Sequence, residues 1–477
     1  MGRPALEAFW DLERYLTVAA GDHLGLPEIE RQSEQRGREL VRLALQAHLD
    51  ARGDGEVGAA IVVDGPDGPV RLTHKKLHTR TVLTVFGPVS VTRVGYRAPG
   101  QTSIHPLDAE LRLPAPTYSY ELQRRVVRAA VCGPFDEAIS VLAEMTGVAI
   151  PKRSAEEIVK DAAADFETFY TGRTGATAGL PAQAILVGAI DCKGIPMVKP
   201  QGATRPVRRR KGDKANKKKM ATVAAVFSQQ PCVRTPTDVV DSLFTIPDTR
   251  PRRPRRPRPA NKRVWASLIS GKDTFIADVA AETARRDPDR RHTWVMVTDG
   301  ERALQRRVAA TFSDATLVLD LLHVLEKLWK AAYVFHPEAS PEAAAFVRDR
   351  AHRILNGQVS QVVKGLRQMV TKRKLTGAKA ATLLNVAAYH YANRDRMRYH
   401  VYLNNGWPIA SGSVEGACKN LIPDRFERSG MRWTPETAEA MLKLRAVHLS
   451  GDAETYWDWH TQQDQQRLHW NTPWRVA

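Results

Sequence analysis

The stretch Ala184-Ile-Leu-Val-Gly-Ala-Ile-Asp191 is an apolar run that ends in an acid, and it predicts a buried strand. Two later runs have the same form, Trp294-Val-Met-Val-Thr-Asp299 and Thr316-Leu-Val-Leu-Asp320. Strands are also expected at about 220–227 and 264–269, and helices at about 273–286, 301–311 and from Asp320 to about 335. Strands that can form hairpins come first, and strands and helices then alternate along the chain. This order favours an α/β mixed sheet with helices packed on it.

The chain before residue 172 predicts helical segments and a β-hairpin. Two helices are expected between residues 5 and 52, and strands between 57 and 96, where a Gly87-Pro88 turn joins Thr81–Phe86 to Val89–Val94. Helices follow at about 120–131, 135–145 and 152–170. The Thr146-Gly147 break favours either a helix-turn-helix, with Lys152 and Arg153 opening the DNA-recognition helix, or an ordinary helical bundle.

Beyond residue 337 the pattern contains helices without strands. An all-helical insertion is expected over 341–399, and a last helical region over about 413–449, interrupted near Gly430. The predicted organisation is an N-terminal helical segment (1–56), a β-hairpin segment (57–117), a helical, candidate helix-turn-helix domain (118–172), the first part of a catalytic core (180–336), the helical insertion (337–405) and the C-terminal helices of the core (406–477).

The chain has 477 residues and a formal net charge of +19, of which two short arms supply +16. Arg205–Lys219 holds nine basic residues and one acid, and Arg250–Arg263 holds eight basic residues and no acid. Dense cationic runs attract nucleic acid because neutralised phosphates release counterions. In the second arm arginine alternates with proline, which indicates an extended and solvated backbone. The alternative is a disordered loop without a partner. The DNA-contact candidates of the first arm are Arg208, Arg209, Arg210, Lys217, Lys218 and Lys219.

Composition excludes several other classes of protein. No apolar run reaches the roughly 18–20 residues that cross a bilayer, and acids at Glu7 and Asp11 interrupt the place of a signal peptide. The four cysteines form no Cys-x-x-Cys pair, which argues against a disulfide framework and against a cysteine-rich zinc site. We therefore expect a soluble, basic, cytoplasmic protein that is not associated with a membrane.

Three separated acids are candidate catalytic and metal-binding residues. Asp191 and Asp299 follow strands, and Glu415 begins a helix. Ligands bind beyond strand ends in open α/β sheets, and carboxylates hold Mg²⁺ or Mn²⁺. Two such ions about 4 Å apart support phosphodiester chemistry. Singly, each acid also has a structural explanation: Asp191 in a turn, Glu415 at a helix N-terminus, and Asp299 inside a capping box of Thr298 and Glu301.

Asp320 and His323 form a second candidate catalytic pair. At i and i+3 in the first turn of a helix they share one face, beside the proposed acids. The imidazole is then placed to contact a scissile phosphate or a metal-bound water. The alternative is a capped helix with a partly buried histidine.

Several runs of this sequence together resemble bacterial insertion-sequence transposases of the Kra type, which are similar to mutator-like DDE transposases. The resemblance extends from about Phe86 to the C-terminus and is most specific over Ser411–Trp433. The matching runs are Ile185–Met197, Lys219–Val223, Thr298-Asp-Gly-Glu-Arg302, Asp320-Leu-Leu-His323, Gly412-Ser-Val-Glu415-Gly-Ala-Cys-Lys419 and Arg428-Ser-Gly-Met-Arg-Trp433.

The resemblance implies a bacterial protein associated with the nucleoid, and an RNase H-like core with a helical insertion before the last acid. It implies that Asp191, Asp299 and Glu415 form the metal-binding triad, with Asp320 and His323 near it. It implies DNA contacts from Arg425, Arg428, Arg432 and Trp433, the last stacking on an exposed base; the alternative is a cationic helix face with Trp433 in the core. Two features depart from the family: Tyr96–Asp108 lacks the Cys-x-x-Cys element of many relatives, and the Arg250–Arg263 arm has no counterpart.

The sequence thus predicts a DNA transposase that uses Mg²⁺ or Mn²⁺ to hydrolyse phosphodiesters at transposon ends and then transfers the strand into target DNA. Its expected partners are the double-stranded terminal inverted repeats and target DNA, and synapsis of two ends favours a homodimer or higher oligomer. Two rival hypotheses are a non-catalytic DNA-binding protein derived from a transposase, and an RNase H-like nuclease that selects DNA by its structure.

Overall fold

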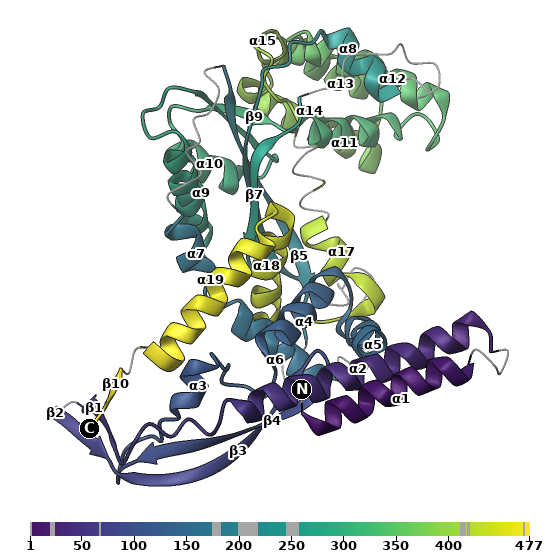
Figure 1. Cartoon of the computed structure of the whole chain (residues 1–477). Helices are drawn as coiled ribbons and strands as arrows, with labels where there is room; N and C mark the ends of the chain where they lie inside the picture. The colour runs from purple at the N-terminus through teal and green to yellow at the C-terminus, as the bar shows by residue number, and fades with distance from the viewer. Residues whose placement is uncertain are drawn as a thin grey trace, which may run out of the picture. The chain divides into compact units, whose positions relative to one another are not determined.

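The fold is described from a computed structural model of the chain (Figure 1). The structure describes residues 2–19, 24–65, 68–173, 183–198, 218–244, 257–410, 416, 420–470 and 473–477. The chain divides into two compact units, Met1–Tyr170 with Asp452–Ala477, and Thr171–Gly451. Each unit is described by itself.

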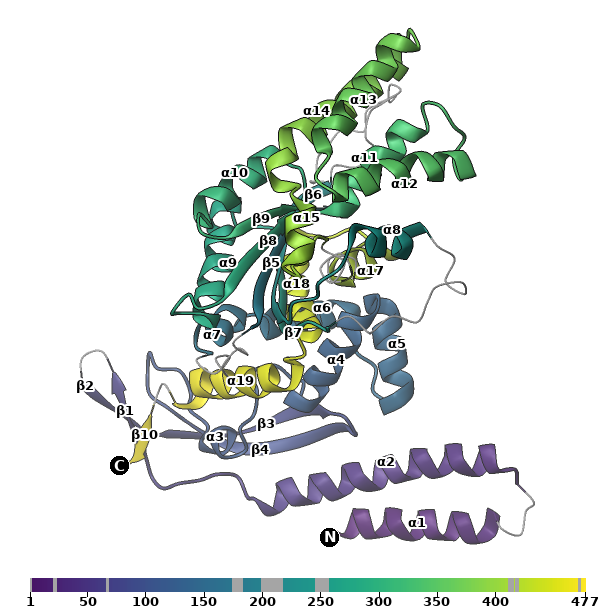
Figure 2. The ribbon, with the colours of Figure 1, turned by 90° about the horizontal axis from the view of Figure 1, so that it is seen from above.

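The first unit combines helices with two small antiparallel sheets. Its elements are α1 (Arg3–Ala19), α2 (Leu26–Ala51), β1 (Ile61–Gly65), β2 (Gly68–Leu72), β3 (His74–Thr84), β4 (Gly87–Arg97), α3 (Pro106–Glu110), α4 (Tyr120–Cys132), α5 (Phe135–Thr146), α6 (Lys152–Ala162), α7 (Phe166–Thr171), α19 (Ala453–Gln465), η4 (Gln466–Trp470) and β10 (Trp474–Val476). Helix α1 packs along α2, as Figure 2 shows, and α2 packs on β4.

The predicted hairpin is present as β3 and β4, with a small difference at its turn. The pairing runs from His74↔Arg97 to Thr84↔Gly87, so Val85 and Phe86 make the turn. Gly87 is the first residue of β4, with φ +117°, a backbone conformation that glycine adopts without a steric penalty. The sequence placed the turn at Gly87-Pro88.

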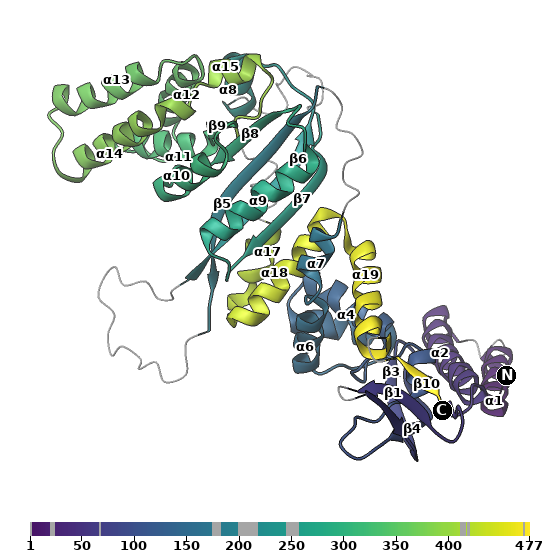
Figure 3. The same ribbon diagram turned by 90° about the vertical axis from the view of Figure 1, so that its left-hand side faces the viewer.

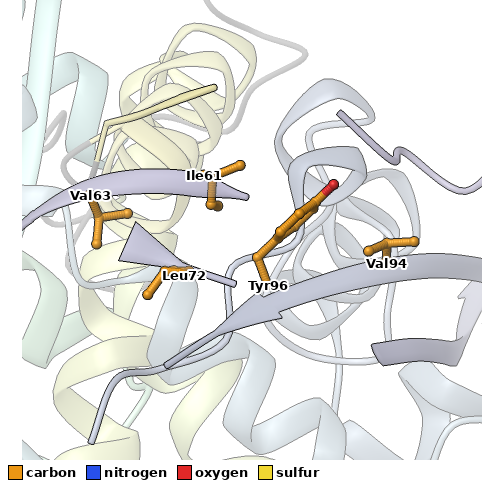
Figure 4. Packing of buried hydrophobic residues seen from close by; sticks show 5 residues of the cluster. All are labelled: Ile61, Val63, Leu72, Val94 and Tyr96. Atoms are coloured by element: carbon orange, nitrogen blue, oxygen red, sulfur yellow. The ribbon is translucent and has the colours of Figure 1, made fainter. Parts of the chain in front are cut away.

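The C-terminal residues complete the three-stranded sheet β10-β1-β2. Strand β1 pairs antiparallel with both β10 and β2. Buried side chains pack between this sheet and β4, and Figure 4 shows them: Ile61, Val63, Leu72, Val94 and Tyr96. Residues 452–477 therefore belong with the first unit, whereas the sequence grouped them with the core helices.

The helices of the first unit are fixed by a buried ionic cluster. Asp165 accepts hydrogen bonds from Arg467 (2.6 Å) and from Nδ1 of His460 (2.7 Å). Asp165 lies in the turn between α6 and α7, so the helix expected over 152–170 is two helices. The cluster holds α19 and η4 against this turn.

The second unit is built on a five-stranded mixed sheet in the order β7-β6-β5-β8-β9. The strands are β5 (Ile185–Pro196), β6 (Lys218–Gln229), β7 (Ala260–Ser267), β8 (Thr293–Thr298) and β9 (Thr316–Leu319). Strands β5, β6 and β7 pair antiparallel, and β8 and β9 run parallel to β5. This agrees with the α/β mixed sheet that the sequence predicts.

Helices cover the sheet where the chain crosses between parallel strands. The crossovers contain α9 (Lys272–Arg286) and α10 (Arg302–Thr311), and Figure 3 shows α9 in front of the sheet. Helix α18 (Pro435–Ser450) packs against β7. There, Glu439 accepts hydrogen bonds from Ser267 (2.8 Å) and from the backbone of Leu268 (2.7 Å).

A helical insertion follows the last strand of the sheet. Its helices and those after it are α11 (Leu321–Ala332), α12 (Pro341–Leu355), α13 (Val359–Lys372), α14 (Gly377–Asn393), η2 (Arg394–Arg396), α15 (Tyr399–Asn404), α17 (Pro423–Phe426) and η3 (Arg428–Gly430). The helix α8 (Pro236–Phe244), between β6 and β7, packs on α12. The hydroxyl of Tyr399 donates to the carbonyl of Leu319 (2.8 Å), which fastens the end of the insertion to β9.

Candidate active site

Asp191 and Asp299 are neighbours on adjacent parallel strands. The β5–β8 ladder ends at the pair Ile190↔Thr298; Asp191 is the next residue of β5, and Asp299 is the first residue after β8. Because neighbouring strands lie about 4.8 Å apart, this register brings the two carboxylates together. Strand β5 continues to Pro196 on β6 alone, so Asp191 lies within β5 and not at its end as the sequence predicts.

The pKa of Asp191 is raised by its surroundings, and Asp299 contributes to the shift. Partial burial raises the pKa of Asp191, and the charge of Asp299 raises it further. A hydrogen bond from the backbone of Cys192 (2.6 Å) and the nearby His323 act in the opposite direction. The side chain of Asp299 accepts from the backbone of Glu301 (3.0 Å). The pair therefore carries repulsion that a bound cation would relieve.

Asp320 and His323 reach the same edge of the sheet. The backbone of Asp320 donates to the carbonyl of Thr298 (2.9 Å), which places it beside the end of β8. Its buried carboxylate caps α11 by accepting from the backbone of Leu322 (2.8 Å). His323 lies one turn on, half-exposed, with Nδ1 at 3.7 Å from Glu326 and close enough to Asp191 to influence its pKa. Asp320 therefore caps the helix, as the alternative interpretation holds, and the role of His323 at the acids stays a prediction.

The capping box expected around Asp299 is wrong. Helix α10 begins at Arg302, so Glu301 is the N-cap residue and Thr298 is the last residue of β8. Glu301 instead accepts a hydrogen bond from Nζ of Lys272 (2.8 Å). Since Asp299 precedes the helix, its carboxylate is not a first-turn residue of α10.

A tyrosine of the insertion, Tyr389, lies against the loop that carries Asp299, and no pattern in the sequence predicts it. A Cβ atom placed on Gly300 would lie 2.1 Å from the hydroxyl of Tyr389, so α14 approaches the loop after β8 with no space for a side chain. Burial raises the pKa of Tyr389, and Asp299, Glu326 and Asp320 raise it further. Tyr389 is therefore a neutral hydroxyl beside Gly300, the residue after Asp299.

The donor set fits a divalent cation in part. Two partly buried carboxylates that repel each other are the hard oxygen ligands that Mg²⁺ and Mn²⁺ prefer. The third expected ligand, Glu415, lies outside the described residues. Among the residues that are described, no group of three or more His, Cys, Asp or Glu side chains has the geometry of a metal site.

Two of the expected DNA contacts are buried. Trp433 is 4% exposed, and its indole donates to the carbonyl of Phe426 (3.3 Å). Its backbone pairs with Pro196 and Met197 at the end of β5. Arg425 is fully buried over the Trp433 ring, and burial lowers its pKa to about 10. Both residues fill the core of this unit, so base stacking by Trp433 and a phosphate contact by Arg425 are not supported.

The other candidate contacts differ in their exposure and pairing. Arg428 and Arg432 are exposed near α17, as is Lys219 on β6. Lys218 is also exposed, and its Nζ lies 2.5 Å from Glu427. The candidates Arg208, Arg209, Arg210 and Lys217 lie outside the described residues, as do residues 250–256 of the second arm.

The candidate helix-turn-helix has the expected elements. Helix α5 ends at Gly147 in the left-handed conformation (φ +67°), and α4, α5 and α6 pack on one another. Lys152 and Arg153 are exposed at the start of α6, but each is paired, with Asp136 (2.6 Å) and Glu157 (3.2 Å) respectively. DNA reading by α6 remains a prediction.

No family model and no curated protein matches this chain. A solved structure, the Drosophila P element transposase strand transfer complex, aligns over 72% of this chain and 94% of that chain, with 8% sequence identity and a TM-score of 0.36. A likeness at this level does not establish a shared fold. None of the helices in the described ranges is long and apolar enough to cross a membrane.

Proposed function

We propose that this protein is a DDE-type DNA transposase with an RNase H-like core. The observation that carries the proposal is the register of β5 and β8, in which Asp191 and Asp299 each follow the last residue pair of the ladder, Ile190↔Thr298. The sheet supports it: three antiparallel strands followed by two parallel ones, with β5 at the centre, are expected of an RNase H-like core. The position of the helical insertion, between β9 and the segment of Glu415, agrees with the family resemblance.

Asp191 and Asp299 would hold Mg²⁺ or Mn²⁺, with Glu415 as the third ligand. The ions would supply charge neutralisation and lower the barrier to attack at phosphorus. Water attacks a phosphodiester at the transposon end, the P–O3′ bond breaks and the 3′ oxygen takes a proton. The freed 3′ hydroxyl then attacks a phosphodiester of target DNA.

The surrounding residues have distinct tasks in this proposal. Asp320 holds the first turn of α11 in place, so that His323 faces the site and can contact the scissile phosphate. The neutral hydroxyl of Tyr389 is a hydrogen-bond donor above the loop after β8. The expected partners are double-stranded transposon ends and target DNA, brought together in a dimer or higher oligomer.

A cleavage assay with the DNA that flanks the gene tests the proposal. The full chain should nick a duplex carrying the terminal repeat in Mg²⁺ and not in EDTA. Asp191→Asn and Asp299→Asn should each abolish nicking and strand joining while retaining binding. Asp314→Asn, an exposed acid of the same unit, is the matched control and should keep full activity.

The outcomes separate the rival functions. Binding without any cleavage by the wild-type chain would favour the non-catalytic DNA-binding protein. Cleavage of branched DNA without strand joining would favour the structure-selective nuclease. Equal cleavage in EDTA, or by Asp191→Asn, would reject the metal-dependent mechanism.

A further inference from the structure

The helical insertion contains a long stretch without acidic residues. Residues 350–394 include nine basic residues and no Asp or Glu. They are Arg350, Arg353, Lys364, Arg367, Lys372, Arg373, Lys374, Lys379 and Arg394. A surface helix of a globular protein normally mixes both signs, because opposite charges at i and i+4 stabilise it. This stretch lies apart from the two arms at 205–219 and 250–263.

The structure places most of this charge on one helical hairpin. Helices α13 and α14 pack side by side and are joined by a short turn, as Figures 2 and 3 show. Arg350, Arg353 and Arg394 have acidic partners, in Asp349 or Asp395. The remaining six bases are all exposed on the hairpin, and the structure records no ion pair for them with any described acid.

The exposed face of α13 suits a hydrated polyanion. The apolar side of α13 is buried through Val359, Val362, Val363 and Leu366. Its opposite side presents exposed Lys364, Arg367 and Lys372 among serine, glutamine and threonine side chains. This face has no large exposed apolar side chain, which argues against insertion into a lipid surface.

An exposed tyrosine between two arginines lies beside this face. Tyr391 of α14 is 47% exposed. Arg367 of α13 lies 5.5 Å from its ring centroid, and Arg394 lies 4.5 Å from it. The ring attracts both guanidinium groups by cation–π interaction. Arg394 also donates to the carbonyl of Tyr391 (3.0 Å) and pairs with Asp395, so Arg367 is the cation of this pair that counts toward the exposed face.

We propose that the α13–α14 hairpin is a binding surface for the backbone of double-stranded DNA. The six cations lie on helices of 14 and 17 residues and on the turn that joins them, and a helix of 17 residues is about 25 Å long. Duplex DNA carries one negative charge per about 1.7 Å, so the surface meets several phosphates at once. This inference deepens the proposed function and rests on it for the choice of DNA as the polyanion.

The test is the salt dependence of binding to a fluorescent 40-bp duplex of arbitrary sequence. The full chain is compared with the triple variant K364Q/R367Q/K372Q, whose substitutions lie on an exposed face and leave the buried side of α13 unchanged. Each lost phosphate contact should lower the slope of log K against log[salt] by about 0.9, which is about a fivefold loss of affinity at 0.15 M salt. A loss of two to three contacts is expected.

A matched control removes the same charge elsewhere. R3Q/R291Q/K330Q neutralises three exposed bases, each paired with an acid, and should leave the slope within about half a unit of the wild type. Thermal melting of both variants confirms folding. An unchanged slope in the hairpin variant, or equal losses in both variants, would overturn the proposal. A loss seen for duplex RNA but not for duplex DNA would also overturn it.

Failure of this inference is distinguishable from failure of the proposed function. If the wild type cleaves transposon ends and K364Q/R367Q/K372Q binds DNA with the wild-type slope, the hairpin proposal is wrong and the transposase proposal stands. If DNA binding depends on the hairpin and no cleavage occurs in any divalent metal, the hairpin proposal stands and the catalytic one is wrong.

Discussion

The contact between α14 and the loop after β8 leads to a prediction about Gly300. In Gly300→Ala the new Cβ would lie 2.1 Å from the hydroxyl oxygen of Tyr389, and 2.3 and 2.5 Å from two of its ring carbons. Ordinary contacts are about 3.5 Å, so the ring or the loop must move by more than about 1 Å. Overpacking of this kind costs about 1–3 kcal/mol of stability.

The same displacement should reach the carboxylates. Gly300 follows Asp299 directly, and a misplacement of about 1 Å at a catalytic group lowers the rate by about 100-fold. We therefore expect Gly300→Ala to lower the free energy of unfolding by about 1–3 kcal/mol and DNA cleavage by about 100-fold, while DNA affinity stays unchanged.

A double-mutant cycle separates this clash from a general effect of alanine at position 300. Tyr389→Ala removes the atoms that the new methyl group meets, so adding Gly300→Ala to it should cost little further stability. The coupling free energy, from urea unfolding of the four proteins, should be at least about 1 kcal/mol. Strictly additive losses would show that Tyr389 does not pack on Gly300.

Three further predictions concern charged and aromatic side chains of the second unit. Burial raises the pKa of Glu282, but Arg263 and Arg286 outweigh it and lower the value from 4.5 to about 2, which corresponds to about 3 kcal/mol. Glu282→Gln should cost about that much at pH 7, and the difference from wild type should vanish as the pH falls from 4.5 to about 2, measured by urea unfolding; a pH-independent difference would contradict this. Trp433→Phe should bind DNA with the wild-type affinity in an anisotropy titration. If Trp433 stacked on a base, its loss would instead cost about 1–3 kcal/mol of binding free energy. Arg425→Gln should lower the melting temperature and leave the salt slope of DNA binding unchanged, whereas Arg428→Gln should lower that slope by about 0.9 if it contacts a phosphate.

Much of the fold could be predicted because its sheet is made of buried apolar runs. Residues 185–190 are all buried, and they form the part of β5 flanked by strands on both sides. The strand continues through Asp191–Pro196, which is more polar, because β6 alone pairs with it there. Local pattern carries no information on such pairing with a distant strand. The pairing of β10 with β1 was missed for the same reason.

The candidate site was predictable only where local pattern specifies it. Asp191, Asp299 and Asp320 each follow an apolar run, and parallel strands carry them to one edge. Tyr389 lies on a helix of the insertion, nearly a hundred residues after Asp299 in the chain. Trp433 is buried where its backbone pairs with the end of β5. Both positions are set by tertiary packing.

The total net charge of the chain does not reveal the basic α13–α14 hairpin. Outside the two arms the chain has a net charge near zero, but residues 337–405 alone hold twelve basic residues against four acids. Acidic residues outnumber basic ones in the rest of the chain, so the local excess of positive charge does not appear in the total net charge. The structure reveals it because α13 and α14 pair into one body and expose the unpaired bases together.

The most direct test of the account is cation binding at the paired aspartates. Calorimetric titration of the full chain with Mn²⁺ should show a site whose affinity falls at least about tenfold in Asp191→Asn and in Asp299→Asn, because each substitution removes one hard oxygen ligand and its charge. Asp314→Asn should titrate like the wild type. Identical isotherms for all four proteins would contradict the claim that Asp191 and Asp299 share a metal.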